Sequence, residues 1–532
     1  MKVYNSLHFQ KEEFEPLDPN RILMYVCGPT VSDSPHLGHA KSAIAFDVIR
    51  RYLEFKDYDV KIVKNYTDID DKIIKRAKER NQDYKELSQY YINDYEEIMQ
   101  KLNVKPENEN PQVTENIDFI IKFIEKLIEN GHAYESNNSV YFSINTLKGY
   151  RNIFQNIEDE EDETEPIPED EEPLFGDKYD PKDFALWKKK KKGEPAWESP
   201  WGEGRPGWHI ECSAMAIKYL GDMIDIHGGG QDLKSPHHRN EIAQSTAYTR
   251  NDVFAKYFLH NGFVQIDNEK MSKSVGNFFL VSEVLEKFEP MVIRLFLLSS
   301  HYRSSVNYSL ESMEQAKKNY EKLLNTIKKI DSLSIKDELD EQLSNLIRNM
   351  DKSREDIISA MENDFNTPVA IVEILSLFRE INRYILEEEG SLNDKFKDNF
   401  FSLIKMIDSI FGIFPDLKKR LQLGVASNFD KRGKIANELL GIINNLYSKF
   451  RDDKIGKGIR EGLINHFGKF PHKVEELDLK KAGSFDKRGK TIKNLVDVIL
   501  NARKKLREQH QYDISDDIRD KLRELGINVE DN

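Results

Sequence analysis

Two histidines that flank a glycine are the first residues whose types and spacing suggest chemistry. His36 and His39, with Gly38 between them, follow an expected strand and loop and stand at the start of an expected helix. A helix start offers unpaired backbone N–H groups and the positive end of the helix dipole, which both favour phosphate. The imidazoles can donate hydrogen bonds to phosphate oxygens, and Gly38 leaves room for a flat base. In this context the short pattern indicates a nucleotide site.

A second candidate is the polar segment 270–274 (KMSKS), which is followed by Gly276 and Asn277. A loop of this composition can close over a triphosphate and place the point charges of Lys270 and Lys273 on it. The alternative is an ordinary surface turn.

The chain contains two cysteines, Cys27 and Cys212, and its charged N-terminus lacks an apolar signal segment, so no disulfide is expected. Two buried thiols without a chemical role are the simplest interpretation. With His237 and Glu241 they make a donor set that zinc accepts. Spacing alone supports such a site weakly, because the cysteines lie far apart in the chain.

A helix is expected to bring His237 and Glu241 together. Ser235 is its expected N-cap and Pro236 its first residue, which puts the two side chains one turn apart on the same face. An exposed helix pair without a ligand is the alternative.

Together and in this order, the HxGH and KMSKS segments resemble the signature pair of class I aminoacyl-tRNA synthetases. Longer strings resemble the cysteinyl branch of that family, densely so over residues 21–309. The strings are residues 24–31 (MYVCGPTV), 65–72 (NYTDIDDK), 207–215 (GWHIECSAM), 225–230 (DIHGGG), 236–238 (PHH), 240–245 (NEIAQS), 364–368 (DFNTP) and 517–522 (DIRDKL). Residues 412–483 match less clearly.

The resemblance implies an enzyme that activates L-cysteine with ATP and attaches it to the 3′ end of tRNA(Cys). The implied ligands of one zinc ion are Cys27, Cys212, His237 and Glu241. The implied catalytic residues are His36, His39, Lys270 and Lys273, and the implied ATP contacts are His36, Gly38, His39 and Lys273. Magnesium is expected to accompany the ATP without a dedicated site. The implied cysteine pocket contains Thr67, Trp208, His227 and Asp232, although His227 can also be read as a hydrogen-bonded core histidine.

Zinc gives a physical basis for choosing cysteine over serine. The two amino acids have nearly the same shape, and a pocket separates such pairs by only roughly 10–200-fold. A thiol loses its proton on zinc and binds as thiolate, whereas a hydroxyl gains far less. Four protein ligands are typical of a closed structural site, so the resemblance implies that the substrate thiol joins as a fifth ligand. No segment of editing-domain size interrupts residues 39–270.

Some residues depart from the family pattern. Ser32, Ser34 and Pro35 precede the first histidine, where aromatic or small residues are more usual, and Arg239 replaces a usual acid. The acidic stretch 157–173 resembles an insertion and is expected to be a solvated loop. None of these departures removes a residue with an expected chemical role.

The expected elements suit this interpretation. Strands at 21–27 and 58–64 enclose a helix at 36–56, which predicts a βαβ unit with a parallel sheet. Further strands are expected at 139–144, 223–227 and 257–262. From residue 309 onward apolar residues recur at helical spacing. The expected helices are 310–330, 339–362, 369–388, 396–410, 434–450 and 491–509.

The predicted fold class is therefore an α/β Rossmann-type nucleotide-binding catalytic domain with a connective insertion, followed by an all-α, anticodon-binding C-terminal half. The predicted domains are a first catalytic half (1–110), the insertion (111–200), a second catalytic half (201–255), a stem-contact region with KMSKS (256–308), a helical bundle (309–425) and a C-terminal tRNA-binding region (426–532).

Charge is compatible with tRNA but would not have suggested it. The net charge is −14, yet residues 158–172 hold eleven acids and no base, whereas residues 481–510 hold nine bases and three acids. The lysine run 188–192 is interpreted as an exposed turn rather than an RNA contact. No apolar run approaches the ~20 residues that a membrane span needs. A cytoplasmic protein is expected, and the resemblance implies a monomer.

Two other functions fit parts of this pattern. A ligase that joins activated cysteine to a small amine would share the zinc, HxGH and KMSKS chemistry, but it would not need a long helical half. A non-catalytic zinc protein that binds RNA would not need both histidines and both lysines.

Overall fold

The computed structural model describes residues 1–154, 177–266, 269–270, 279–335, 340–387, 391–415, 442–443, 446, 498–508 and 511–524. The chain forms two compact units, Met1–Pro415 and Asp416–Asn532. The acidic stretch 157–173, Lys273, most of the expected helix 434–450 and residues 491–497 of the expected helix 491–509 lie outside the described residues.

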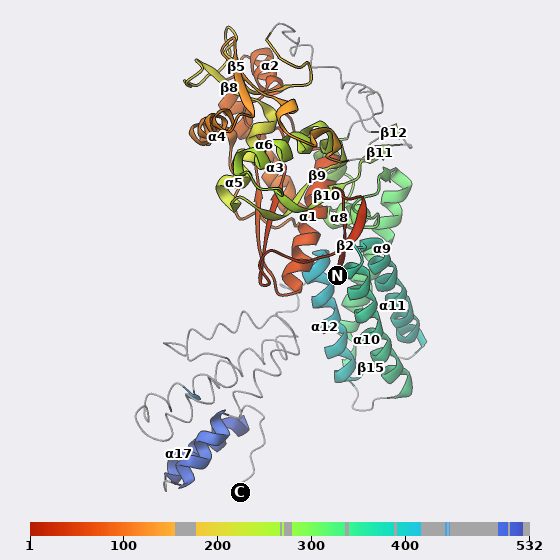
Figure 1. Ribbon diagram of the computed structural model, residues 1–532. Helices are drawn as coiled ribbons and strands as arrows, with labels where there is room; N and C mark the ends of the chain where they lie inside the picture. Colours follow the sequence, from red (N-terminus) through yellow and green to blue (C-terminus); the bar gives the residue numbers. More distant parts are fainter. Residues whose placement is uncertain are drawn as a thin grey trace. The chain divides into compact units, whose positions relative to one another are not determined.

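A four-stranded parallel sheet forms the centre of the first unit (Figure 1). Its strands lie in the order β10 (Ala255–Asn261), β9 (Ile224–Gly230), β3 (Arg21–Val26) and β4 (Asp59–Lys64). Helix α1 (Leu37–Phe55) connects β3 to β4, which pair in parallel, so the predicted βαβ unit is confirmed. Helices α5 (Trp208–Leu220) and α6 (Arg239–Thr249) precede β9 and β10. Such crossovers cover both faces of the sheet, which explains its buried apolar strands.

Residues 133–206 contain a separate antiparallel sheet, whose last strand lies beyond the predicted insertion. Its strands are β5 (Ala133–Ser136), β6 (Ser139–Phe142), β7 (Phe184–Lys189) and β8 (Gly204–Pro206), and the helices before it are α2 (Asp71–Arg80), α3 (Tyr84–Lys101) and α4 (Ile117–Glu129). Lys188 belongs to β7 and pairs with Asp71 at 3.2 Å, and Lys190 pairs with Glu203 at 2.7 Å. The predicted turn over the whole lysine run is therefore wrong, because the strand continues into it.

A three-stranded sheet follows the parallel sheet. Strand β11 (Val264–Ile266) lies between β12 (Glu269–Lys270) and β13 (Val306–Tyr308), and helices α7 (Val281–Leu285) and α8 (Pro290–Leu298) separate β12 from β13 in the chain. At the N-terminus, β1 (Lys2–Asn5) and β2 (Gln10–Glu13) form a hairpin.

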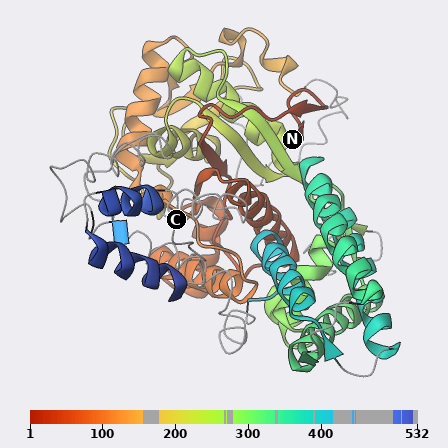
Figure 2. The same ribbon diagram turned by 90° about the horizontal axis from the view of Figure 1, so that it is seen from below.

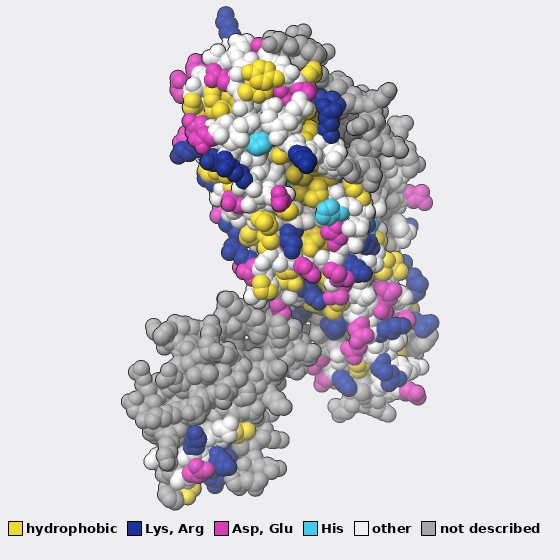
Figure 3. Space-filling view, viewed as in Figure 1, with side chains coloured by type: hydrophobic (Ala, Val, Ile, Leu, Met, Phe, Trp, Pro, Cys, Tyr) yellow, Lys and Arg dark blue, Asp and Glu magenta, His cyan; other side chains and the backbone are white. Residues whose placement is uncertain are grey.

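Four predicted helices of the second half are confirmed. They are α9 (Leu310–Ser332), α10 (Glu341–Glu362), α11 (Thr367–Glu387) and α12 (Asp394–Phe411). Helix α12 lies beside α1 (Figure 2). The segment after α9 and the segment before α12 pair as two short parallel strands, β14 (Ser334–Ile335) and β15 (Ser391–Leu392), which were not predicted. Acidic and basic side chains are interspersed over the face of these helices that Figure 3 shows.

In the second unit, residues 498–508 are helical and α17 spans Tyr512–Glu524. Among the helices that the structure describes, none combines the length and the apolar character needed to cross a membrane.

Candidate metal centre and nucleotide site

The four predicted metal ligands meet at the carboxyl edge of the parallel sheet. Cys27 directly follows β3, Cys212 lies in α5, His237 precedes α6, and Glu241 lies in the first turn of α6. One donor atom of each lies within 4.8 Å of the others, and all four residues are buried. The carboxyl edge is the usual place for ligands in open α/β sheets, because the loops after the strands converge there.

The distances and charges within this cluster fit a cation. The sulfur of Cys27 lies 3.6 Å from that of Cys212 and 3.3 Å from Glu241 Oε1, and His237 Nε2 lies 2.9 Å from the same oxygen. The Cys27 thiol, which donates to the Cys212 sulfur, lowers the pKa of Cys212 to about 6. Two sulfurs, an imidazole and a carboxylate are a donor set that zinc accepts.

His237 reaches Glu241 by a different local structure from the predicted one. Helix α6 begins at Arg239, and the residues Lys234–His238 before it form one wide, π-helical turn. Ser235 has extended backbone angles inside that turn (φ −139°, ψ 133°). The prediction that Ser235 caps a helix starting at Pro236 is therefore wrong. The His237 ring and the Glu241 carboxylate still meet, because the two residues keep their spacing of four along the chain.

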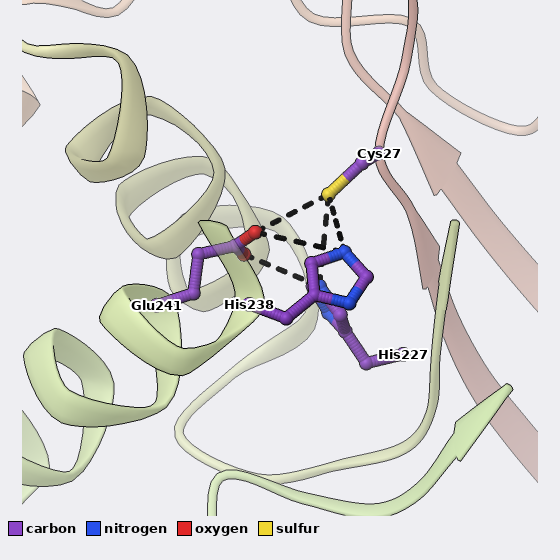
Figure 4. Close-up of side chains that lie close together, drawn as sticks. All are labelled: Cys27, His227, His238 and Glu241. Carbon is purple, nitrogen blue, oxygen red and sulfur yellow. Dashed lines mark hydrogen bonds and ion pairs between the residues drawn. The ribbon is translucent and has the colours of Figure 1, made fainter. Parts of the chain in front are cut away.

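A second donor set shares two of these residues. Figure 4 shows His227 and His238 beside Cys27 and Glu241, and these four donor atoms also lie within 4.8 Å of one another. His227 Nε2 lies 3.2 Å from Glu241 Oε2, and His238 Nε2 lies 3.4 Å from the Cys27 sulfur.

The hydrogen-bond partners of these histidines distinguish the two sets. Nδ1 of His227 and Nδ1 of His260 have no partner among the described residues, and His238 Nδ1 lies 2.8 Å from His260 Nε2. A buried N–H without an acceptor is rare, so both unpartnered nitrogens are assigned as bare. His260 then donates to His238, and His227 and His238 both present Nε2–H groups to the Cys27 sulfur, at 3.6 Å and 3.4 Å. As N–H donors they orient the metal ligands, and the geometry favours the set with Cys212 and His237.

The HxGH segment forms a reciprocal cap at the start of α1. His36 Nδ1 accepts hydrogen bonds from the backbone N–H groups of Gly38 (3.0 Å) and His39 (3.4 Å), and His39 Nδ1 accepts one from the His36 N–H (3.3 Å). The Leu37 N–H donates to the Phe279 carbonyl. The expectation of unpaired backbone N–H groups is therefore wrong. Because both rings accept at Nδ1, both are assigned as carrying a proton on Nε2.

The described residues on either side of the KMSKS segment are held by backbone pairing, and those after it lie beside this cap. Lys270 lies in β12, where it pairs with Gln265 of β11, although its side chain is outside the described residues, as is all of Lys273. After the segment, the Val281 N–H donates to the Pro35 carbonyl at 2.9 Å. Residues 279–281, which follow the second predicted motif in the chain, are thus neighbours of the first.

Comparison with known proteins agrees with this arrangement. Residues 13–318 match the family model "tRNA synthetases class I (C) catalytic domain", and residues 356–415 match a DALR domain. A cysteine–tRNA ligase of Thermococcus onnurineus is 41% identical over 100% of this chain and 97% of its own length. The chain belongs to the cysteine–tRNA ligase family.

Other relatives support the same family and fold. A cysteine–tRNA ligase of Geobacillus sp. is 48% identical over 74% of this chain and 83% of its own length. Among solved structures, a Mycobacterium tuberculosis methionyl-tRNA synthetase in complex with methionyl-adenylate shares the fold, with a TM-score of 0.56 and 15% identity over 74% of this chain and 92% of that chain.

Three of the four residues expected to form the cysteine pocket of this cysteine–tRNA ligase family member lie beside the metal donors. The Trp208 ring stacks on His237 with centroids 4.2 Å apart, and 38% of Trp208 is exposed. His227 is fully buried against Glu241. The Thr67 hydroxyl donates to Glu211 Oε2 at 3.0 Å. Asp232 instead occupies an exposed turn after β9.

Sequence reasoning missed three histidines around this centre. His209 Nδ1 lies 2.9 Å from His237 Nδ1, and burial lowers the pKa of His209 well below its ordinary value, so its ring is a neutral acceptor. His209 and His238 stand inside strings that carry the family resemblance, which was a usable signal. His260 lies at the end of β10, where only pairing with β9 brings it close.

Proposed function

We propose that this chain activates L-cysteine with ATP, forming cysteinyl-adenylate and pyrophosphate, and then transfers cysteine to the 3′ end of tRNA(Cys). The observation that carries the specificity for cysteine is the buried set of Cys27, Cys212, His237 and Glu241 at the carboxyl edge of the sheet. Zinc bound by these four would supply a soft positive charge that favours a thiolate over a hydroxyl.

The protein's own groups orient this centre. His237 can donate its Nδ1–H to the neutral ring of His209, which leaves Nε2 directed at the donor cluster. His238 and His227 both donate an Nε2–H to the Cys27 sulfur. Trp208 stacks on His237 and remains partly exposed to solvent.

In the first step a carboxylate oxygen of cysteine attacks the α-phosphorus of ATP, and the bond from that phosphorus to the bridging oxygen of pyrophosphate breaks. A carboxylate is already a nucleophile, so the work is positioning and charge stabilisation. His36 and His39 donate Nε2–H groups to phosphate oxygens, and Lys273, with Lys270, supplies positive charge to the departing phosphates.

In the second step a hydroxyl of the terminal ribose attacks the carbonyl carbon of the adenylate, and AMP leaves. We assign the grip on tRNA to the helical half. The DFNTP segment has another use: Asp364 is fully buried and accepts hydrogen bonds from the Tyr302 hydroxyl (2.9 Å) and Arg303 Nε (2.8 Å). Asp364 thus stabilises the packing within the first unit.

The deciding experiment is cysteine-dependent charging of purified tRNA(Cys), run beside ATP–pyrophosphate exchange with cysteine. We expect both activities, with serine inactive in both. Exchange without charging, together with a covalent cysteine–amine product, would instead identify the small-amine ligase. Absence of both activities in a zinc-loaded protein would leave the non-catalytic RNA-binding alternative and contradict the proposal.

A further inference from the structure

Lys41 is a buried amine on α1, close to the HxGH cap. Only 2% of the residue is exposed, and its Nζ donates to the backbone carbonyls of Ser304 and, at 3.4 Å, Phe263. Burial lowers the pKa of Lys41 to about 7. The same part of α1 lines a small cavity with Tyr302 and Thr367. Lys41 therefore bridges the first turns of α1 to two other chain segments.

The segments of Phe263 and Ser304 contact each other just before the starts of β11 and β13, two strands of the sheet that contains β12. Phe263 directly precedes β11, and its carbonyl also accepts the Val306 N–H of β13 at 2.9 Å. The Gly262 N–H donates to the Tyr302 carbonyl at 2.8 Å, and a Cβ on Gly262 would lie 2.5 Å from the Ser304 carbonyl carbon. The backbones thus touch directly, and Lys41 fastens both of them to α1.

This junction leads to the KMSKS segment. Strand β11 pairs with β12, which contains Lys270, so the start of the segment is built on β11. Beyond the segment, residues 279–281 are tied to the HxGH cap by backbone hydrogen bonds from Val281 to Pro35 and from Leu37 to Phe279. Backbone hydrogen bonds, which do not depend on the side chains, hold residues 279–281 after the segment. On the other side, the Lys41 side chain holds the chain segments from which β11 and β13 begin.

We propose that Lys41 is a positioning residue for cysteine activation, which fixes the β11–β13 junction, and through it the start of the KMSKS segment, at a set distance from His36 and His39. The inference rests on the proposed function, since it concerns the same ATP site. Lys41 itself touches no reacting atom; it acts through the strands that it holds.

A positioning role and a purely structural role make different predictions. A buried amine is costly to desolvate, and an apolar side chain of similar length can replace it with little loss of stability. The placement of charge on a transition state, in contrast, is sensitive to small displacements. Loss of the Lys41 hydrogen bonds is therefore expected to reduce the rate of the chemical step more than the stability or the binding of cysteine.

The test compares Lys41→Met, Lys41→Arg and wild type in cysteine-dependent ATP–pyrophosphate exchange by the full-length zinc-loaded protein. We expect Lys41→Met to lower kcat about 10–100-fold, with the KM for cysteine, the zinc content and the melting temperature at pH 7 unchanged. Lys41→Arg, which keeps N–H donors, is expected to recover most of the rate. The matched control is Lys61→Met, because Lys61 Nζ also donates to a backbone carbonyl, that of Tyr219 at 2.7 Å, away from the site.

A folded Lys41→Met protein with wild-type kcat would overturn the proposal, and so would an equal loss of rate in Lys61→Met. If Lys41→Met does not fold, Lys41→Gln decides by the same measurements: a selective loss of kcat supports the proposal, and a wild-type kcat overturns it. Failure of the wild type to show any cysteine-dependent exchange would instead refute the proposed function.

Discussion

At the scale of single residues, proton positions decide what each histidine of this protein can do. His36 and His39 cap each other through Nδ1, which leaves Nε2–H as the donor of each ring. His238 accepts from His260 and therefore faces Cys27 as a donor. In both places a neighbouring donor occupies Nδ1, so the proposed role of each ring depends on the group that its Nε2–H faces.

The metal set is tested by Cys212→Ser. Removal of one thiolate is expected to abolish stoichiometric zinc binding and, with it, the rejection of serine, because shape alone discriminates weakly. Zinc content by elemental analysis and serine-dependent exchange are the two measurements. His132→Asn is the control, since His132 pairs with Thr146 far from the cluster. A zinc-replete Cys212→Ser protein that still rejects serine would disprove the link between metal and selection.

Lys273 is tested by replacement with alanine. We expect ATP–pyrophosphate exchange to fall by orders of magnitude while cysteine binding stays nearly intact, because the lost charge acts on the transition state and not on the amino acid. The control is Lys287→Ala, an exposed lysine between α7 and α8. Unchanged exchange in Lys273→Ala would remove this lysine from the mechanism.

The buried amine of Lys41 predicts a pH dependence of stability. Its pKa in the folded protein is about 7, against an ordinary value of 10.5, because burial disfavours the charged form. Between these values the unfolded chain binds more protons, so the contribution of Lys41 to stability rises with pH from 7 to 10.5 and is lost as pH falls through 7. Tyr302, which lines the same cavity, titrates well above this range. As pH rises from 7 to 10.5, the urea midpoint of wild type is expected to increase relative to that of Lys41→Met. A difference between the two midpoints that does not change with pH would contradict this prediction.

At the scale of elements, helix α1 contributes residues to two separate clusters of contacts in the first unit. Its first turns hold His36, His39 and Lys41, and its later turns hold Asp47 and Arg51. Asp47 accepts hydrogen bonds from Arg51 (2.7 Å) and Arg294 of α8. Although burial would raise the pKa of Asp47, the two guanidinium groups hold it below its ordinary value. One helix therefore connects the nucleotide motif to the packing of the helical bundle.

The contacts of Arg294, which join α1, α8 and α12, predict a large effect of its replacement on the free energy of unfolding. Arg294 also donates to the carbonyls of Phe411 (2.7 Å), at the end of α12, and Leu102 (3.0 Å). Arg294→Met leaves Asp47 under-compensated and is expected to cost about 3–5 kcal/mol, whereas a double variant with Asp47→Asn is expected to cost less. All four tryptophans lie in the first unit, so their fluorescence in urea reports this unit.

The control for this joint is Arg348→Met on the exposed face of α10, which is expected to change stability by under about 0.5 kcal/mol. If Arg294→Met unfolds at the wild-type urea concentration, the buried network does not stabilise the joint between α1, α8 and α12.

At the scale of the whole molecule, the two units are expected to divide the reaction. The first contains the metal cluster and both nucleotide motifs, and the second contains the basic stretch that the sequence places in residues 481–510. Binding of RNA phosphates releases counterions and weakens with salt, whereas activation of a small amino acid does not depend on such contacts. Salt should therefore affect the two half-reactions differently.

Lys504, exposed on the helix of residues 498–508, tests this division. Lys504→Glu is expected to raise the KM for tRNA(Cys) and to lower the slope of log KM against log salt by about 1, with exchange unchanged. The control is Lys101→Glu, at the end of α3 beside Glu97. An equal effect in both variants would indicate general charge and not a specific contact; loss of exchange in Lys504→Glu would contradict the division.

The sequence by itself determined the types of donor, the order of elements and the family. Local periodicity reports burial, so α1, α9 and α12 could be placed within a few residues. The four candidate metal ligands were predicted by resemblance to family strings, and only the packing of α5 against β3 brings Cys212 within 3.6 Å of Cys27.

Only the tertiary structure decided how each residue is used. The wide turn before α6, the reciprocal cap of His36 and His39, and the burial of Lys41 and Asp364 all depend on partners distant in the chain. A periodic pattern shows that a side chain is buried but not which atom it meets. Chain segments far apart in sequence set those contacts when they pack, which is why the donors at the nucleotide site are ring nitrogens and not the expected backbone amides.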